Sequence, residues 1–385
     1  MGGDESEAAH AGMEQAIEPN VDDHTERLGR EKGSSRPFVD AAPAATLAAG
    51  RRRGRGWMER SEVRSLYFLA AFLVAAYALP FVVGMWYGTV RWDAEWLGYL
   101  GTVVLSGFLQ GGVYAMFAVG LTMIFGVMRI INAAHGEMVM MGAYLTWVAF
   151  FFLGVDPLLS LVFTLPIAFL FGMVLQKVLL NAVVGQPELT GLLVTFGLGL
   201  TMIYVVELIF TTDFRTIPYA PQSVRITDTI AVGQNKLISF AMALVISLGV
   251  YFFLRLTRIG KAIRATALNA EVAMVCGINV GRIYLITTGL AVSLAVAGGA
   301  LVSIQFGFNP ETGIVYTLQA FTIVILGGRG DYVGALIGGF MLAVLESLVS
   351  LMIPNGTAMV ELAAYGLLIA VLLIRPGGIM GVKEA

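Results

Sequence analysis

The sequence has little cysteine and little charge, and each scarcity excludes a class of protein. Cys276 is its one cysteine, which excludes an intrachain disulfide and any metal cage built from cysteines. Lys, Arg, Asp and Glu make up only 13% of the residues, about half the share usual in soluble domains, while 57% are hydrophobic. The chain is therefore predicted to be a membrane protein that crosses the bilayer several times rather than a soluble globule.

Sequence motifs of nucleotide-hydrolysing and hydrolytic enzymes are also missing. Gly260-Lys261 is followed by Ala262 and lacks the glycine-rich loop that cradles phosphates before it. There is no His-Glu-x-x-His and no Gly-x-Ser-x-Gly pattern. We therefore expect a chain that is not an enzyme, does not hydrolyse ATP itself, and binds no cofactor or metal.

The charge that is present is concentrated in the first 64 residues, which carry 10 Lys/Arg and 12 Asp/Glu. Residues 1–65 are polar with few aromatics and are predicted to be a disordered, charged cytoplasmic tail. Five residues from Arg51 to Arg55 include four arginines directly before the first apolar run. Such a cluster could bind nucleic acid, but beside a membrane helix it usually fixes orientation, so we expect a cytoplasmic N-terminus and no nucleic-acid partner.

Long apolar runs fill the rest of the chain and predict an all-α, polytopic transmembrane bundle of about 9–10 helices or half-helices. A first helix at 66–90 precedes a main domain at 98–376. The other runs are at 98–127, 136–154, 158–180, 190–212, 236–254, 283–306, 314–327, 333–353 and 357–374. Run 314–327 is short enough to be a half-helix or a re-entrant segment. If every run crosses, the segment 213–236 lies outside and both termini lie in the cytoplasm of a cell-membrane protein.

Two polar or glycine-rich interruptions break this series of helices. Residues 128–137 place Asn132, His135, Gly136 and Glu137 between apolar runs, and Gly327-Gly328 interrupts the short run. Non-helical backbone at membrane depth is tolerated where protein buries it or where it lines a cavity, and transporters often bind solute at such breaks. We predict that these six residues border a translocation path. The alternatives are an ordinary interfacial turn for the first interruption and a tight turn or close helix crossing for the second.

A polar island at 255–282 forms the largest predicted cytoplasmic feature after the tail. Ile259, Ile263, Ala267, Ala270 and Met274 share one face of a helical wheel. Asn269 is predicted to cap a second short helix and Gly277 to end it. The charged residues of the opposite face are Arg258, Lys261, Arg264 and Glu271. Such a basic amphipathic pair can rest on lipid or dock on another protein; the alternative is a loop that only orients the chain.

Ionisable residues also lie inside apolar runs, where a charged side chain can indicate a functional role. Glu207 and Glu346 are costly to bury, so each is a functional hypothesis by default, although neither has an evident partner in the sequence. If the chain were a stand-alone transporter driven by an ion gradient, one of them would be the coupling carboxylate. Gln110, Gln305 and Gln319 are expected to form hydrogen bonds between helices.

Three stretches together resemble one family, the LivH-like permeases of ABC importers for branched-chain amino acids. They are 126–137, 258–278 and 325–339, and the resemblance covers about residues 98–375 in the order and spacing of the family. It implies a permease subunit that translocates branched-chain amino acids or a similar small polar solute; similar permeases import urea or short amides. It also implies a second related permease, two cytosolic ATPase subunits that use ATP, and an extracytoplasmic substrate-binding protein.

The same resemblance implies that part of the island couples the permease to an ATPase. The residues concerned are Arg258, Gly260, Lys261, Arg264, Glu271 and Gly277. The chain departs from the family pattern in its polar tail, in its added first helix, in Ala133 and in the charges of Arg329 and Asp331. A secondary transporter and a membrane scaffold without transport are the competing classes.

Overall fold

A computed structural model describes residues 67, 70, 71, 73–375 and 377–380, and the predicted tail at 1–65 lies outside them. The predicted all-α bundle is confirmed in this part of the chain: eight helices are long and apolar enough to cross a membrane, and two apolar helices are shorter. The shorter ones are Leu73–Trp86, which stands for the predicted first helix, and α10 (Thr312–Gly327). The predicted short run 314–327 is thus a helix of 16 residues.

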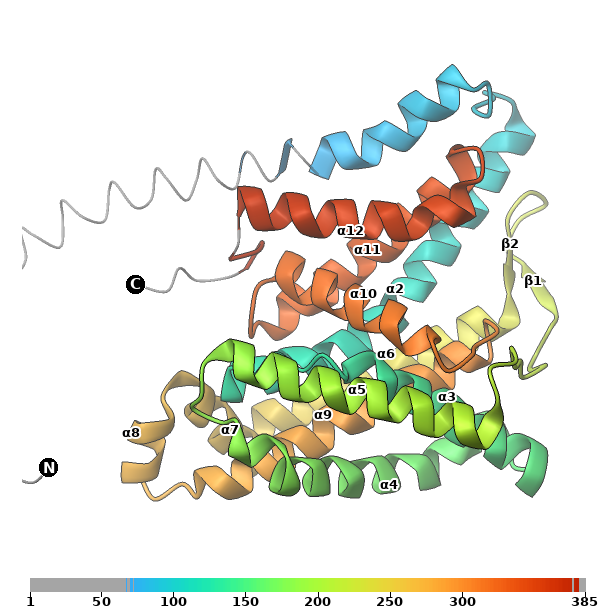
Figure 1. Ribbon diagram of the computed structural model, residues 1–385. Helices are drawn as coiled ribbons and strands as arrows, with labels where there is room; N and C mark the ends of the chain where they lie inside the picture. Colours follow the sequence, from blue (N-terminus) through green and yellow to red (C-terminus); the bar gives the residue numbers. More distant parts are fainter. Residues whose placement is uncertain (1–66, 68–69, 72, 376, 381–385) are drawn as a thin grey trace, which may run out of the picture. The chain divides into compact units, whose positions relative to one another are not determined.

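The remaining elements follow the apolar runs closely (Figure 1). The long helices are α2 (Ala94–Met128), α3 (His135–Leu153), α4 (Pro157–Val178), α5 (Glu188–Phe210), α6 (Gln234–Leu256), α9 (Val280–Ser303), α11 (Tyr332–Met352) and α12 (Gly356–Ile374). The short helices are η1 (Leu180–Ala182), α7 (Arg258–Leu268) and α8 (Ala270–Val275). Strands β1 (Ser223–Arg225) and β2 (Ala231–Gly233) pair antiparallel, with Val224 opposite Val232.

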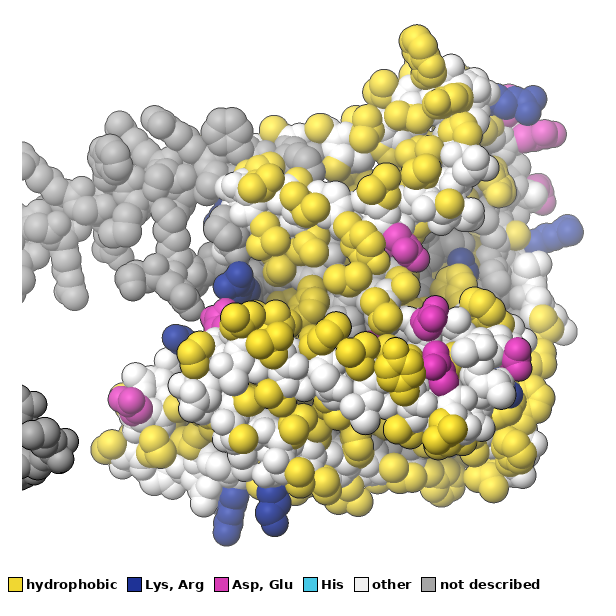
Figure 2. All heavy atoms as spheres, in the orientation of Figure 1, with side chains coloured by type: hydrophobic (Ala, Val, Ile, Leu, Met, Phe, Trp, Pro, Cys, Tyr) yellow, Lys and Arg dark blue, Asp and Glu magenta, His cyan; other side chains and the backbone are white. Residues whose placement is uncertain are grey.

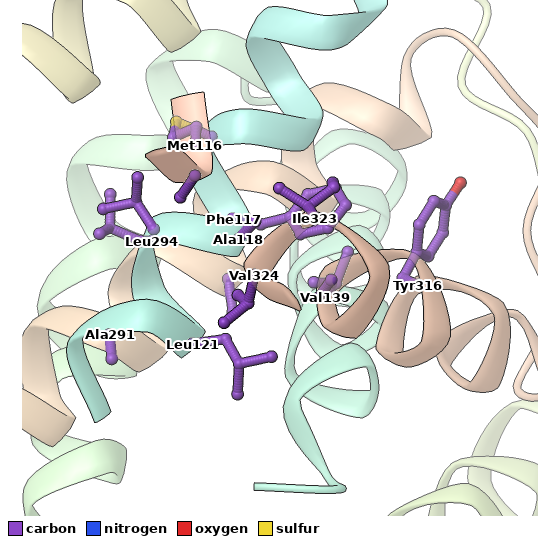
Figure 3. Close-up of a cluster of buried hydrophobic side chains, with 14 of the residues drawn as sticks. Met116, Phe117, Ala118, Leu121, Val139, Ala291, Leu294, Tyr316, Ile323 and Val324 are labelled. Carbon is purple, nitrogen blue, oxygen red and sulfur yellow. The ribbon is translucent and has the colours of Figure 1, made fainter. Parts of the chain in front are cut away.

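Helix α2 is the centre of the bundle. It has 35 residues and is buried continuously from Leu109 to Ile124. Asp93 caps its start, because its carboxylate accepts a hydrogen bond from the Trp96 amide at 2.8 Å. Figure 3 shows Phe117 and Leu121 of this helix among side chains of α3, α9 and α10. Small residues allow α9 to approach: a Cβ on Gly298 would lie 2.8 Å from Cβ of Phe117.

Helix α5, by contrast, is held along one narrow stripe. Its four buried residues, Gly191, Thr195, Gly199 and Ile203, are spaced four apart and share one face. Large apolar side chains cover the other faces, and Leu208 is 87% exposed. In a membrane such a surface contacts lipid or another protein, because water would not solvate it.

The connections gather at two opposite ends of the helices (Figure 1). The strands β1 and β2 lie at one end, where the Ala231 amide donates to Thr102 Oγ1 near the start of α2. Helix α7 lies at the other end, where Ile263 and Arg264 share a cleft with Gly330 and Tyr332. This arrangement agrees with the prediction that 213–236 and 255–282 face opposite sides of the membrane; which side is cytoplasmic stays a prediction.

Candidate functional site

The predicted helix break between α2 and α3 is present and is buried. Helix α2 ends at Met128, where Arg129 takes a left-handed conformation with φ 54°, and the next helix begins only at His135. A helix break leaves amide groups without intrahelical partners, which is costly in the absence of water. The polar side chains around the break supply those partners.

Asn132 and a threonine of α5 accept hydrogen bonds from two amides of the break. Asn132 is fully buried, and its Oδ1 accepts from the Ala134 amide at 3.1 Å. Thr195 Oγ1, reaching across from α5, accepts from the Ala133 amide at 2.9 Å. The break is therefore a fixed conformation that α5 helps to hold.

His135 ties the start of α3 to the middle of α2. Its Nε2 donates to the Phe117 carbonyl over 2.8 Å, so the ring carries its proton on Nε2. The ring is fully buried, and Nδ1 has no hydrogen-bond partner in the part of the chain that the structure describes. Because Phe117 stands 11 residues before the end of α2, His135 lies about 16 Å along the axis from that end. The break thus enters the bundle instead of forming a surface turn.

Glu137 and Gly136 meet α10 at Thr317. The Gly136 amide donates to Thr317 Oγ1 at 2.8 Å, and that hydroxyl donates to Glu137 Oε2 at 3.2 Å. Glu137 is 3% exposed and stands in the first turn of α3, where a helix dipole favours a negative charge. Threonine 317 was not anticipated from the sequence, because a single threonine in an apolar run carries no pattern.

The approach of α3 to α10 explains why position 136 is glycine. A Cβ there would lie 1.9 Å from the Gly313 carbonyl oxygen and 2.3 Å from the Thr317 amide nitrogen. Gly199 of α5 closes the other side, since a Cβ on it would lie 3.4 Å from Cδ of Glu137. Four predicted residues, Asn132, His135, Gly136 and Glu137, are therefore brought together by α2, α5 and α10.

Gly327 and Gly328 lie apart from this cluster. They end α10, ten residues and about 15 Å of helical rise beyond Thr317. A Cβ on Gly327 would lie 2.3 Å from the carbonyl carbon of Gly334, and Gly328 has φ +114°. A close helix crossing and a tight turn account for both glycines, and their place on a path stays a prediction.

A second buried polar cluster joins α2, α10 and α11. Gln319 Nε2 donates to Glu346 Oε1 at 3.0 Å and to Tyr114 Oη at 3.2 Å, which confirms the predicted interhelical role of this glutamine. Glu346 is thus a bonded side chain, 7% exposed. The same prediction was wrong for Gln305, which bonds the Leu301 carbonyl of its own helix end, and Gln110 has no partner among the described residues.

Acidic side chains collect on the face that carries α5 and α12. Figure 2 shows a hollow between these two helices, with Asp and Glu side chains at one end of it. Glu207 is half-buried on α5, and Glu361 is exposed on α12, inside helices of spanning length. A carboxylate facing lipid is costly, so this face fits water or protein better than lipid. Glu361 was missed in the sequence, although a lone acid in the run 357–374 was available as a signal.

The island forms two capped helices as the sequence indicated. Asn269 Oδ1 accepts from the Val272 amide at 3.0 Å, and Gly277, with φ +82°, ends the segment. Gly260 is buried, and a Cβ on it would lie 2.4 Å from the Phe253 carbonyl oxygen, so it seats α7 on the end of α6. The four charged residues predicted for the face opposite the apolar one are exposed: Arg258, Lys261, Arg264 and Glu271.

The apolar face of the island is only partly seated on the rest of the chain. Ile263 is buried, whereas Ile259 is 42% exposed and Met274 55% exposed. In the described residues no three side chains of His, Cys, Asp or Glu come together as metal ligands. What the island offers is a surface of exposed charges and apolar side chains.

Comparison with known proteins points to one family. Residues 103–372 match the family described as branched-chain amino acid transport system / permease component. The high-affinity branched-chain amino acid transport system permease protein BraD of Pseudomonas aeruginosa is 30% identical over 295 residues, covering 73% of this chain and 95% of the relative. LivH of Escherichia coli K12, described in the same terms, is 29% identical with the same coverage.

Two more distant likenesses complete the comparison. A probable branched-chain amino acid transport permease protein LivH of Methanocaldococcus jannaschii is 25% identical and covers 73% of this chain and 92% of the relative. A solved structure, PsaBC from Streptococcus pneumoniae in complex with Fab, has a TM-score of 0.38 and 14% identity over 74% of this chain and 94% of that one. That score is too low to compare the two part by part.

Proposed function

The chain belongs to the family of branched-chain amino acid transport permeases, and from this premise we propose that it forms the transmembrane channel of an ATP-driven importer. Its solute is a branched-chain amino acid, as the names of the relatives BraD and LivH state for those proteins. The family is one of transport subunits and not of enzymes, so ATP is hydrolysed by partner subunits. The chain is a multi-pass membrane protein, with the end that carries α7 and α8 in the cytoplasm.

The observation that carries the proposal is the buried polar break between α2 and α3. Within the apolar bundle it sets Asn132, His135 and Glu137 against Thr195 of α5 and Thr317 of α10. A zwitterionic amino acid crossing a membrane needs such groups, because its ammonium and carboxylate must be solvated by the protein. Transport folds place solute at broken helices for this reason.

Helix α5 controls access to these groups in the proposed mechanism. It covers the break, yet it buries only four residues against the rest of the chain. Elements with few buried contacts open at the lowest free-energy cost. A small displacement of α5 would open Glu137 and Thr317 to the hollow between α5 and α12.

A second permease subunit, in this proposal, completes the path across that hollow. The apolar side chains of α5 need a cover of lipid or protein, and the exposed carboxylate of Glu361 is costly to leave in lipid, so a protein surface suits both. A related chain packed against α5 and α12 supplies one. A substrate-binding protein would then deliver solute at the end that carries β1 and β2.

The segment 258–277 receives the movement of an ATPase. Energy must enter this chain through a contact with a partner, and the exposed charges Arg258, Lys261, Arg264 and Glu271 are available for that contact. Charged groups at an interface set orientation and register. Gly260 passes the movement on, because it packs α7 directly on the backbone of α6.

Reconstitution tests the whole proposal. The chain is placed in proteoliposomes with its ATPase, second permease and binding protein, and uptake of labelled leucine, isoleucine and valine is followed with and without ATP. ATP-dependent uptake of these solutes is expected, with little competition from urea or short amides. Uptake by this chain alone, driven by a proton gradient without ATP, would make it a secondary transporter and overturn the proposal.

A further inference from the structure

A groove at membrane depth runs along α6 on the surface shared by α2, α6 and α11. It holds a volume of about 320 Å³ and is lined chiefly by Phe240, Leu244, Leu248, Leu336 and Phe340. From Phe240 to Tyr251 the helix rises about 16 Å, close to the depth of one leaflet of a hydrocarbon core about 30 Å thick. The groove is therefore apolar over the length of one leaflet.

The groove continues into a second cleft at the end that carries α7. The two spaces share Tyr251 and Tyr332 in their walls, and the cleft has a volume of about 500 Å³. Arg255 and Arg264 line the cleft, and no Asp or Glu lines either space. The apolar groove thus opens toward two positive charges.

These two arginines carry no carboxylate partner within the described part of the chain. Arg255 Nη1 donates to Tyr251 Oη at 2.6 Å, and Arg264 Nη2 donates to the Arg255 carbonyl at 3.4 Å. The ion pair that the described residues form is elsewhere, between Arg91 and Asp93. Guanidinium groups held beside an apolar groove form a receptor for an anion attached to an apolar chain.

We propose that this groove binds an anionic phospholipid, with one acyl chain along α6 and the phosphate at Arg255 and Arg264. The dimensions favour a lipid over a protein helix. A volume of about 320 Å³ spread over about 16 Å gives a mean cross-section of about 20 Å², whereas a helix with side chains is about 10 Å across. Basic pockets between membrane helices at the cytoplasmic face commonly take anionic headgroups.

The lipid site does not depend on transport, but it reaches the proposed coupling segment. Ile263, Arg264 and Ala267 of α7 form one wall of the cleft. A bound headgroup would therefore fill the space between α7 and the helices α2 and α11, and would fix the distance between them. The position of the coupling segment then depends on the lipid composition of the membrane.

Lipid titration of the purified full-length chain tests the site. The delipidated protein is titrated with phosphatidylglycerol or phosphatidylcholine, and bound lipid is counted by native mass spectrometry. The double variant Arg255→Gln/Arg264→Gln is expected to bind phosphatidylglycerol roughly thirtyfold more weakly, about fivefold for each charge, with phosphatidylcholine unchanged within about twofold. Leu248→Trp, which fills the groove, is expected to weaken both lipids, whereas Val245→Trp on the exposed face of α6 leaves both unchanged.

A matched pair of charges separates this site from general attraction to anionic lipid. Lys177 and Arg282 are exposed in the last turn of α4 and the first turn of α9, near the same end of the bundle, and line neither space. Lys177→Gln/Arg282→Gln is expected to change phosphatidylglycerol affinity by less than about twofold. An equal loss in this control would overturn the proposal. So would wild-type protein that binds phosphatidylcholine as tightly as phosphatidylglycerol, a measurement that needs no variant to fold.

Discussion

The two polar regions that interrupt the apolar sequence, the break at 128–137 and the island at 255–282, satisfy their polar groups in different ways. At the break, Asn132, His135 and Glu137 are buried and bonded to groups of α2, α10 or the break itself. In the island, the helix caps are complete, but Arg258, Lys261 and Glu271 remain exposed. The break is specified by contacts inside the chain, whereas the island is left to be completed by something outside it. Bulky substitutions at the break should therefore impair folding, whereas substitutions in the island should impair contacts with partner subunits.

The largest effect is expected from Gly136→Val, which tests whether the break is fixed by packing. The first added carbon would overlap the Gly313 carbonyl oxygen at 1.9 Å, and backbone cannot yield as a side chain tip can. We expect the folded protein to lose about 3 kcal/mol or more, at or above the usual cost of overpacking, and to be recovered in low yield. Thermal unfolding in detergent, followed by size-exclusion chromatography, measures this.

Gly197→Val is the control for that change. It puts the same β-branched residue into α5, where a Cβ meets nothing within 4 Å. Valine is a better helix former than glycine, so the variant should be as stable as the wild type or more stable, within about 0.5 kcal/mol. If both variants lose the same stability in thermal unfolding, packing at Gly136 does not fix the break.

The next effect concerns the island, where Gly277→Val and Glu271→Lys are expected to uncouple transport. Gly277 has φ +82°, which a β-branched residue adopts at a cost of about 1–3 kcal/mol, so the end of α8 would be rebuilt. Uptake and substrate-stimulated ATPase activity of the reconstituted complex should both fall sharply, while the permease still inserts. Full activity of both variants would mean that the island only orients the chain in the membrane.

Two positions outside the island, at the end of the bundle that carries α7, provide matched controls for these two variants. Gly185 has φ +79° and nothing within 4 Å of an added Cβ, so Gly185→Val carries the same backbone strain outside the island. Glu188 is exposed in the first turn of α5, as Glu271 is in α8, so Glu188→Lys reverses a comparable charge. Both controls should retain activity; equal loss in them would assign the effect to strain or charge in general.

A smaller effect is expected from Glu137→Gln, which keeps the shape of the break and removes its charge. Hydrogen bonds to charged groups contribute about 1.5–3 kcal/mol, so uptake should fall by about tenfold while assembly with the ATPases stays intact. Thr317→Ser keeps the hydroxyl that bonds Gly136 and should behave as the wild type, whereas Thr317→Val leaves that amide unpaired. A complex that fails to assemble with Glu137→Gln would make the cluster structural only.

The last prediction concerns sidedness and is measured by labelling alone. Cys276 is exposed in the island and is a natural label, while Ser223 is exposed in β1 at the opposite end. A membrane-impermeant thiol reagent should reach Cys276 from the cytoplasm only. In a Cys276→Ser background, Ser223→Cys should react from outside only. Labelling of both from one side would overturn the predicted orientation.

Local features of the chain could be predicted from its sequence, whereas partners across helices could not. The break, the Asn269 cap and the Gly277 stop depend on residues a few positions apart, so the local pattern contains them. Thr317 bonds Gly136 across 181 positions, and no periodicity records such a pair. Glu346 had no evident partner for the same reason: Gln319 lies one helix earlier and becomes its neighbour only when α10 packs on α11.

The apolar face of the island shows the same limit. A helical wheel groups Ile259, Ile263 and Met274, yet only Ile263 is buried, because α7 meets the bundle along one edge and α8 turns away after Asn269. A wheel gives the direction of side chains but not the area of the surface they meet. The hollow between α5 and α12 was unpredictable from sequence for the same reason.

Helix α2 acts mechanically as a beam. Its 35 residues span about 50 Å, well over the thickness of a hydrocarbon core, and no proline interrupts them. Near its inner end Met123 and Val127 border the cleft beside α7, while its middle accepts the hydrogen bond of His135. Pivoting such a rod by about 5° at one end displaces the other by about 4 Å. Under the proposed function, a push on α7 would thereby be converted, by leverage alone, into a shift of the groups around His135.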